Sequence, residues 1–301
     1  MKTITTFVTF LFPSFLCLAQ FTNCKVADVD TRLPLYYATV YYGKQPTVTF
    51  SDSLGNFFVQ SEILEQADSV RIEFIGYESL IITSKSIIEG KEFFLKKKNF
   101  ILQDAVVKNC SEYKEKEIDY RYAKMKAHFT AFAQSISYLG YYNNRENITG
   151  YVSQIKFHVQ NVPFIHQNLL IPLRLRWYKW NGEALMPGQE LTDTSLLIYA
   201  YKKGWNTILI PDKTIYFGED GIVMGIEFLY PSSLQKQAAL ITDFKKRNAY
   251  LNQFALHIGM VNDKTKSEGF TKLKDTIRRF CFTDLIFIKP ALNLTIKVCT
   301  K

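Results

Sequence analysis

Histidine is scarce in this chain, and the short motifs that mark enzyme sites are missing. The four histidines are followed by no glutamate three residues later, and they are His128, His158, His166 and His257. The sequence also has no Gly-x-Ser-x-Gly elbow, no phosphate-binding loop and no calcium loop. Because these signatures are absent, we predict no catalytic residue, no metal and no cofactor, and therefore a protein that is not an enzyme.

Long apolar runs are missing beyond the first 19 residues. No later stretch stays apolar for the roughly 20 residues that a transmembrane helix needs. Residues 1–19 combine one cation, Lys2, with an apolar run over 7–18 that contains Pro13, and they end in the small Ala19. This is the pattern of a secretory signal peptide. We expect cleavage before Gln20 and export to the periplasm or the outer membrane; an uncleaved anchor is disfavoured because the run is short.

The charge is basic but is not arranged for nucleic acid. The chain has 37 Lys and Arg against 28 Asp and Glu, a formal net charge of +9. The densest basic runs, 96–98 and 245–247, are not interleaved with aromatic residues as single-stranded nucleic-acid platforms are. We expect a solvated basic surface, with general attraction for acidic glycans or phosphorylated headgroups as the alternative.

Cysteines are few. Beyond Cys17 of the signal segment, four remain and allow three full pairings, namely those of Cys24, Cys110, Cys281 and Cys299. A hairpin that turns about Pro290 places Cys281 opposite Cys299, and such a bridge in an oxidising compartment would contribute roughly 3 kcal/mol. Cys24 and Cys110 flank the first domain and would pair if its ends meet. Four free thiols is the alternative.

The richest pattern lies between residues 33 and 77, where short strands alternate with tight turns. Ala38, Val40 and Tyr42 share one face of a strand, and Val70, Ile72 and Phe74 share one face of another. Between them, residues 52–56 read Asp-Ser-Leu-Gly-Asn, which predicts a turn whose glycine takes a positive φ. This stretch therefore predicts a β-meander.

Several fragments of this stretch resemble a known family. They are Pro34-Leu35 with Ala38-Thr39-Val40, then Thr49-x-Ser51-Asp52-x-x-Gly55-x-Phe57, Ile75-Gly76-Tyr77, and a closing strand with Leu102 and Ala105-Val106-Val107. Together they resemble the carboxypeptidase regulatory-like (transthyretin-like) domain of Bacteroidetes envelope proteins over about residues 22–107. The resemblance implies a small β-sandwich and an envelope location. It implies no peptidase, since the zinc motif of the carboxypeptidases is absent here.

The rest of the chain divides into a connector and a second domain. Residues 108–127 alternate charges without a strong period and predict a connector that is partly helical. Residues 128–301 again read as strands, and Arg174-x-Arg176-x-Tyr178 with Lys203-Gly204-Trp205 resembles a sandwich domain of unassigned activity that follows the regulatory-like domain in many Bacteroidetes chains. One helix is expected over 232–247, with Ser232 and Gln235 as a capping box.

The predicted fold is therefore all-β. A signal peptide (1–19) precedes a transthyretin-like small β-sandwich (20–107), a connector (108–127) and a larger jelly-roll-like β-sandwich (128–301) with one helix.

Isolated acids offer little chemistry. Glu227 stands in an apolar strand, and we interpret it as an outward residue or as a partner of Arg174 or Arg176 rather than as a catalytic acid. Three acidic residues near a predicted turn could bind calcium, but we favour the interpretation that they are simply exposed to solvent. They are Asp212, Glu219 and Asp220.

Four aromatic residues are the best candidates for ligand binding, because rigid rings can stack on sugars. They are Trp180, Tyr199, Tyr201 and Trp205. The structural alternative places them in the core or at sheet edges, and Trp205 after a turn glycine is expected to be a packing anchor. Three functions remain open: a non-catalytic binding or scaffold protein of the envelope, a glycan-binding accessory protein of a polysaccharide-uptake system, and a hydrolase with a dispersed site. Glycans or envelope proteins are the expected partners.

Overall fold

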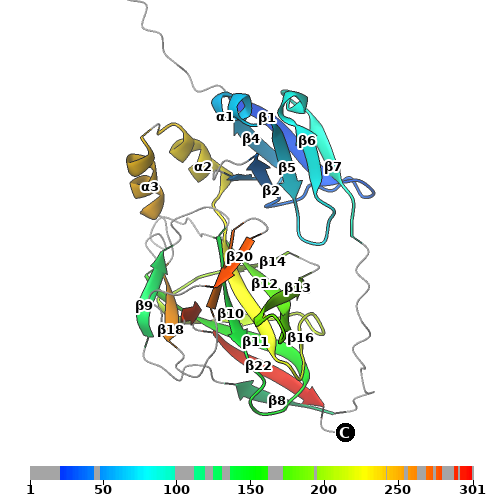
Figure 1. Cartoon of the computed structure of the whole chain (residues 1–301), viewed down its shortest axis with the longest axis vertical. Coiled ribbons are helices and arrows are strands. Elements are labelled where there is room, and N and C mark those ends of the chain that lie inside the picture. The colour runs from blue at the N-terminus through cyan, green and yellow to red at the C-terminus, as the bar shows by residue number, and fades with distance from the viewer. Residues whose placement is uncertain are drawn as a thin grey trace, which may run out of the picture.

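The protein is described here by a computed structural model (Figure 1). The structure describes residues 21–43, 48–98, 112–118, 125–130, 136–161, 172–192, 195–241, 243–253, 257–262, 269–273, 276–279, 288–290 and 292–299. Strands account for 54% of the structure and helices for 12%. The all-β class predicted from the alternating patterns is therefore confirmed.

The N-terminal unit is a small sandwich of two sheets, drawn in blue and cyan in Figure 1. The three-stranded sheet, in the order β4-β1-β7, contains β1 (Phe21–Asp28), β4 (Asn56–Gln60) and β7 (Glu92–Leu95). The four-stranded sheet, in the order β3-β2-β5-β6, contains β2 (Thr39–Tyr42), β3 (Val48–Phe50), β5 (Ser69–Glu73) and β6 (Leu80–Thr83). Short connections are α1 (Ser61–Gln66) and the 3₁₀ turn η1 (Ser84–Ser86).

The two small sheets bury one core between them. Its residues come from alternate positions of both sheets and include Val26, Val40, Phe57, Val59, Val70, Ile72, Phe93 and Leu95. Because the side-chain period of a strand is two, the alternation read from the sequence places these residues on the inner faces. The predicted turn is also confirmed. Asp52 Oδ1 accepts from the amides of Leu54 and Asn56, at 2.9 and 2.8 Å, and Gly55 has a φ of 79°.

The larger unit is a second sandwich. Its seven-stranded sheet contains β10 (Ile136–Tyr142), β12 (Pro172–Asn181), β13 (Met186–Glu190), β14 (Leu196–Tyr199), β17 (Ile222–Phe228), β19 (Gly269–Leu273) and β20 (Thr276–Arg279). Its eight-stranded sheet contains β8 (Tyr113–Ile118), β9 (Met125–Thr130), β11 (Gly150–Asn161), β15 (Gly204–Leu209), β16 (Tyr216–Phe217), β18 (His257–Asn262), β21 (Ile288–Pro290) and β22 (Leu292–Cys299). The core between the sheets includes Trp177, Met224 and Ile226 from the first and Ile155, Phe157 and Leu294 from the second.

Strand β8 lies in the segment that we expected to be a partly helical connector. It pairs with β22 along its whole length, from Ile118 opposite Leu294 to Tyr113 opposite Cys299. Five of its six residues are exposed, because it forms the edge of the sheet and carries alternating lysines and glutamates. Such charged edges discourage pairing with another chain. The mixed charges that suggested a connector thus belong to an edge strand.

The hairpin predicted about Pro290 does not form. Strand β21 pairs with β18, with Pro290 opposite Met260 and Ile288 opposite Asn262. Strand β22 pairs instead with β11 and β8. The prediction was wrong because a two-residue apolar period identifies the buried face of a strand but not the neighbouring strand.

The predicted single helix over 232–247 is two helices, α2 (Ser232–Ala239) and α3 (Phe244–Asn252). The residue before α2 is Pro231 and no side chain caps this helix, so the capping box was also wrong. Asp243 begins the second helix, and its Oδ1 accepts from the amide of Lys246 at 3.0 Å. None of the helices of the described part is long and apolar enough to cross a membrane.

Candidate functional site

The two sandwiches meet at a packed junction on the outer face of the seven-stranded sheet. Helix α2 contacts β3 and β4 of the smaller unit and lies beside that unit in Figure 1. Leu229, directly after β17, joins an apolar cluster with four buried residues of the smaller unit, Tyr37, Tyr41, Val48 and Phe50. This junction buries apolar surface from both units, and a buried ion pair of the larger unit lies beside it.

Gln235 of α2 fastens the helix to strand β3. Its Oε1 accepts from Thr49 Oγ1 at 2.7 Å and from the amide of Phe50 at 3.2 Å. Its Nε2 donates to the carbonyl of Tyr230 at 2.6 Å. The residue is 3% exposed, so these bonds satisfy an amide that would otherwise be buried at considerable cost. Gln235 therefore serves the junction and not the helix cap that we predicted.

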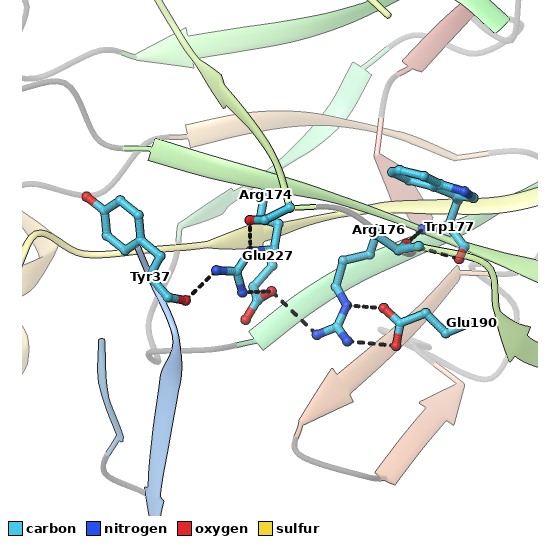
Figure 2. A network of polar contacts seen from close by, with 8 residues as sticks. Tyr37, Arg174, Arg176, Trp177, Glu190 and Glu227 are labelled. Carbon is cyan, nitrogen blue, oxygen red and sulfur yellow. Dashed lines mark hydrogen bonds and ion pairs between the residues drawn. The ribbon is translucent and has the colours of Figure 1, made fainter. Parts of the chain in front are cut away.

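Arg174 and Glu227 of the seven-stranded sheet form a buried ion pair (Figure 2). They face each other in register on β12 and β17, and Arg174 Nη1 lies 3.2 Å from Glu227 Oε2. Their exposed side-chain fractions are 2% and 1%. Arg174 also donates through Nε to Ser195 Oγ at 3.1 Å and through Nη2 to the carbonyl oxygen of Tyr37. One guanidinium thus bonds to both units.

A second arginine extends the pair into a four-membered network. Arg176 Nη1 lies 3.4 Å from Glu227 Oε2, while its Nε and Nη2 donate to the two oxygens of Glu190 at 2.7 and 2.8 Å. The Glu190 contact is bidentate, which is the strongest geometry for this pair. Two arginines and two glutamates together carry no net charge. Our interpretation of Glu227 as a partner of Arg174 or Arg176 is confirmed, and it is a partner of both.

Burial and neighbouring charges act in opposite directions on the two arginines. Burial lowers the pKa of Arg174, and Glu227 opposes that effect. Burial also lowers the pKa of Arg176, but Tyr178, Glu190 and Glu227 outweigh it and the pKa rises. Arginine has such a high pKa that both remain charged. The Glu227 carboxylate accepts from both guanidinium groups, which makes it an acceptor in a fixed network.

The predicted aromatic candidates do not form one platform. Trp180 is partly buried at the end of β12, and its ring stacks on Tyr141 with the centroids 3.9 Å apart and the planes 12° apart. Tyr199, 38% exposed, pairs with Pro172 at the other end of β12. At the strand rise these two ends are about 26 Å apart.

The other two candidates belong to the neighbourhood of β15, in the eight-stranded sheet. Trp205 is partly buried opposite His158, with the rings 5.3 Å apart and edge to face. Tyr201 is 52% exposed, and its hydroxyl accepts from the amide of Thr207. The structure therefore assigns the four aromatics to three separate places on two sheets. The expectation that Trp205 anchors the core is only partly met, because its ring lies on the outer face.

The histidines and acids gather no metal-binding group in the described part of the chain, where no cluster of three or more His, Cys, Asp or Glu side chains exists. His166 lies outside the described residues. Of the turn acids considered for calcium, Asp212 pairs with Lys297 at 3.2 Å. Asp220 uses its carbonyl oxygen to accept from the hydroxyl of Tyr141.

The cysteine predictions are tested at one position. Cys24 is a buried free thiol whose Sγ donates to the carbonyl of Ile88 at 3.3 Å. Of the alternatives left open for this residue, the structure therefore has the unpaired one. Cys110, Cys281 and the side chain of Cys299 lie outside the described residues, so the pairing of the last two stays a prediction.

Comparisons with known proteins find little. No family model and no curated protein matches the chain. Among the solved structures that match is one of the cysteine protease and lectin-like domains of Cwp84, a surface layer associated protein of Clostridium difficile, at 6% identity and a TM-score of 0.38. The match covers 88% of this chain and 59% of that one, so the chain spans less than two thirds of its neighbour. So remote a likeness carries no functional argument.

Proposed function

We propose that this chain is an exported, non-catalytic binding or scaffold protein of the cell envelope, in which a transthyretin-like module and a larger β-sandwich act as one body. The observation that carries the proposal is the network of Arg174, Arg176, Glu190 and Glu227. These are strongly charged residues of one sheet, and they neutralise each other at a junction between units.

The burial of Glu227 supports a structural role for this network. A catalytic acid or base needs access to substrate and a proton that can leave or arrive. Glu227 is 1% exposed and accepts from two arginines, and Arg174 reaches across to the main chain of Tyr37. Breaking such a network would leave buried charges without a partner, which is strongly destabilising. The arrangement therefore favours a structural role, in which the network fixes the two units relative to each other, over a catalytic one.

The expectation of export rests on residues outside the described part. Lys2, the apolar run over 7–18 and the small Ala19 have the order of a signal peptide. The envelope assignment follows from this leader together with the resemblance of residues 22–107 to the regulatory-like domain.

Fractionation tests the location. The full chain with a C-terminal tag, expressed in its native host, is expected in the envelope fraction with an N-terminus near Gln20. Peptide mass spectrometry of each fraction reads that terminus. Recovery of intact Met1 in the cytosol alone would contradict export.

A substrate panel tests the absence of catalysis. The exported chain is incubated with peptides, aryl esters and aryl glycosides, and we expect no turnover above that of buffer. Turnover that disappears in a variant of one residue of this chain would overturn the proposal, since a contaminating enzyme would be unaffected by the substitution.

A further inference from the structure

A row of tyrosines and charges crosses the outer face of the eight-stranded sheet, on the opposite side of the larger sandwich from the junction. The strand register places Tyr216 of β16 beside Tyr151 of β11, Tyr151 beside Lys297 of β22, and Lys297 beside Glu115 of the edge strand β8. Tyr113 begins β8, two residues before Glu115 and on the same face. Three tyrosines from three strands thus share one end of the face.

These rings are not required by the core. The sequence neighbours Val152, Ile296 and Phe217 point inward and belong to the buried cluster of the sandwich. Tyr113 and Tyr216 are 42% and 40% exposed. Tyr151 is half-buried between its neighbours, and its ring meets that of Tyr216 edge to face at 5.5 Å and 68°. The burial of Tyr151 and its nearness to Tyr113 and Tyr216 raise its pKa, so it keeps its hydroxyl proton at neutral pH.

Groups that form hydrogen bonds surround the rings. Lys297 Nζ lies 3.2 Å from Asp212 Oδ1, and both side chains are substantially exposed, at 37% and 66%. Glu115 lies in the same row, and Gln154 projects from β11 in the next one, opposite Thr295. Hydrogen-bond donors and acceptors, including both a cationic and an anionic group, therefore lie within one side-chain length of the exposed tyrosine rings.

We propose that this tyrosine cluster, defined by Tyr113, Tyr151 and Tyr216, binds a neutral glycan chain. Sugar rings offer C–H faces that stack on aromatic side chains and hydroxyl groups that need both donors and acceptors. The inference rests on the function proposed above, because it names the ligand class of an exported binding protein.

Other occupants fit the face less well. Nucleic acid would require a positive surface, whereas Glu115 and Asp212 lie beside Lys297. A protein partner could also use the tyrosines as anchors, but its interface would need further large side chains that binding desolvates completely. On the described outer faces of β8, β11, β15, β16 and β22, the exposed large aliphatic residue is Leu209, and the other outward residues are polar or aromatic.

The face is long enough for more than one sugar ring. Trp205 lies on the same outer face, opposite His158, while Asn206 and Ile208 point inward. From Tyr151 to His158 the strand β11 extends about 20 Å. Trp205 therefore marks the far end of a strip whose near end is the tyrosine cluster, and a long chain would reach both ends while a short one would occupy only the cluster.

Binding of the exported chain to xylan, mannan, an α-glucan and a β-glucan tests the proposal, measured by affinity electrophoresis and by calorimetry with oligosaccharides of the retained polymer. We expect retention by at least one polymer. The substitutions Tyr113→Ala and Tyr216→Ala should each weaken binding by roughly 5- to 100-fold, by analogy with the loss of an aromatic stacking partner. Ile81→Ala is the control, because it also removes an exposed side chain, 66% accessible, but from β6 of the smaller sandwich. Thermal unfolding of each variant separates lost binding from lost folding.

The length of the ligand gives a second readout. Trp205→Ala should weaken binding of long oligosaccharides and leave that of a disaccharide unchanged. The proposal is overturned if no polymer is retained, if Tyr113→Ala and Tyr216→Ala both bind as the unsubstituted chain does, or if Ile81→Ala weakens binding equally. A chain that is found in the envelope but binds no glycan would remove this inference and leave the proposed function standing.

Discussion

The guanidinium of Arg174 donates to the main-chain carbonyl of Tyr37 and, through another nitrogen, to the carboxylate of Glu227. The first bond joins the larger sandwich to the smaller one, and the second pairs the buried guanidinium with a carboxylate of opposite charge. The relation of the two units therefore depends on a side chain with partners in both, because the guanidinium of Arg174 also lies over the ring of Phe74 in the smaller unit, 5.9 Å from its centroid. A substitution in the charge network should therefore weaken the packing of the two units at the junction.

The substitution Glu227→Gln tests this dependence. It leaves Arg174 and Arg176 with a neutral partner while both stay buried or nearly so. Removing one member of a buried ion pair typically costs about 3–5 kcal/mol, so we expect the free energy of unfolding in urea to fall by about that amount. Glu117→Gln is the control, since it removes an exposed pair with Lys156 and should cost less than about 1 kcal/mol. Equal effects in the two variants would show that the network adds nothing beyond a surface pair.

How far this junction was visible in the sequence differs from residue to residue. Arg174 and Arg176 alternate with apolar residues, which is the pattern of one face of a strand. Glu227 is an acid in an apolar strand, so its pairing with an arginine could be predicted. The Tyr37 carbonyl was not, because every residue has a carbonyl and nothing in the sequence marks one that a distant side chain will reach.

The remaining errors have a related cause. The hairpin predicted about Pro290 would pair residues 292 and 294 with the preceding strand, but they lie opposite Phe157 and Ile155 of β11. An apolar period of two is satisfied by any neighbour with the same period. For the helices a local signal did exist, since Asp243 is a favoured N-cap residue in the middle of the predicted single helix. The tyrosine cluster had no local signal, because its three members lie on strands far apart in the chain.

Gly225 occupies the centre of the outer face of β17, opposite Arg176 on one side and Leu139 on the other. A Cβ at this position would lie 2.3 Å from the carbonyl oxygen of Tyr138 and 2.4 Å from Leu139 Cδ2. We therefore expect Gly225→Ala to destabilise the protein by at least the roughly 1–3 kcal/mol typical of overpacking.

Gly182→Ala is the matched control for this prediction, since its new Cβ would approach only Trp180 Nε1, at an ordinary 3.8 Å. Thermal or urea unfolding of both variants provides the comparison. If Gly225→Ala unfolds at the same denaturant concentration as Gly182→Ala, the close approach of β10 and β17 described here is wrong.

Asp28 makes the stability of the smaller unit sensitive to acid. Its carboxylate accepts from the amide of Thr31 at 2.7 Å and from the hydroxyl of Tyr77 at 2.7 Å. These bonds, the Thr31 amide first, lower the pKa of Asp28 from 3.8 to about 2. Because the folded state binds this proton less readily than the unfolded state, the stabilisation is complete above pH 3.8 and is lost as the pH falls towards 2.

The urea midpoint, measured at several values between pH 5 and pH 2, should therefore fall more steeply for the unsubstituted chain than for Asp28→Asn. The asparagine variant should be less stable at pH 5, and the difference should narrow as the pH falls. If the urea midpoints of the two proteins fall in parallel with pH, Asp28 does not contribute to the loss of stability in acid. Asp52→Asn is a useful comparison, since this aspartate also accepts hydrogen bonds from main-chain amides in its own turn. The substitution should change the stability of the protein by altering that turn.

Cys24 should be a conformational reporter for the smaller sandwich. Its thiol is 3% exposed in the core of that unit, and burial raises the pKa of Cys24 from 9.0 to about 11. Alkylating reagents attack the thiolate. This increase in pKa lowers the thiolate fraction of Cys24 at pH 8 by roughly 100-fold relative to an unfolded chain. Modification by iodoacetamide should thus be slow in the native protein and fast in urea. Peptide mapping after timed quenching assigns the alkylation rate to this cysteine. In the Glu227→Gln variant, alkylation of Cys24 should be faster if a weaker junction opens the smaller unit. Rapid native alkylation, or isolation of Cys24 in a disulfide, would contradict the buried free thiol.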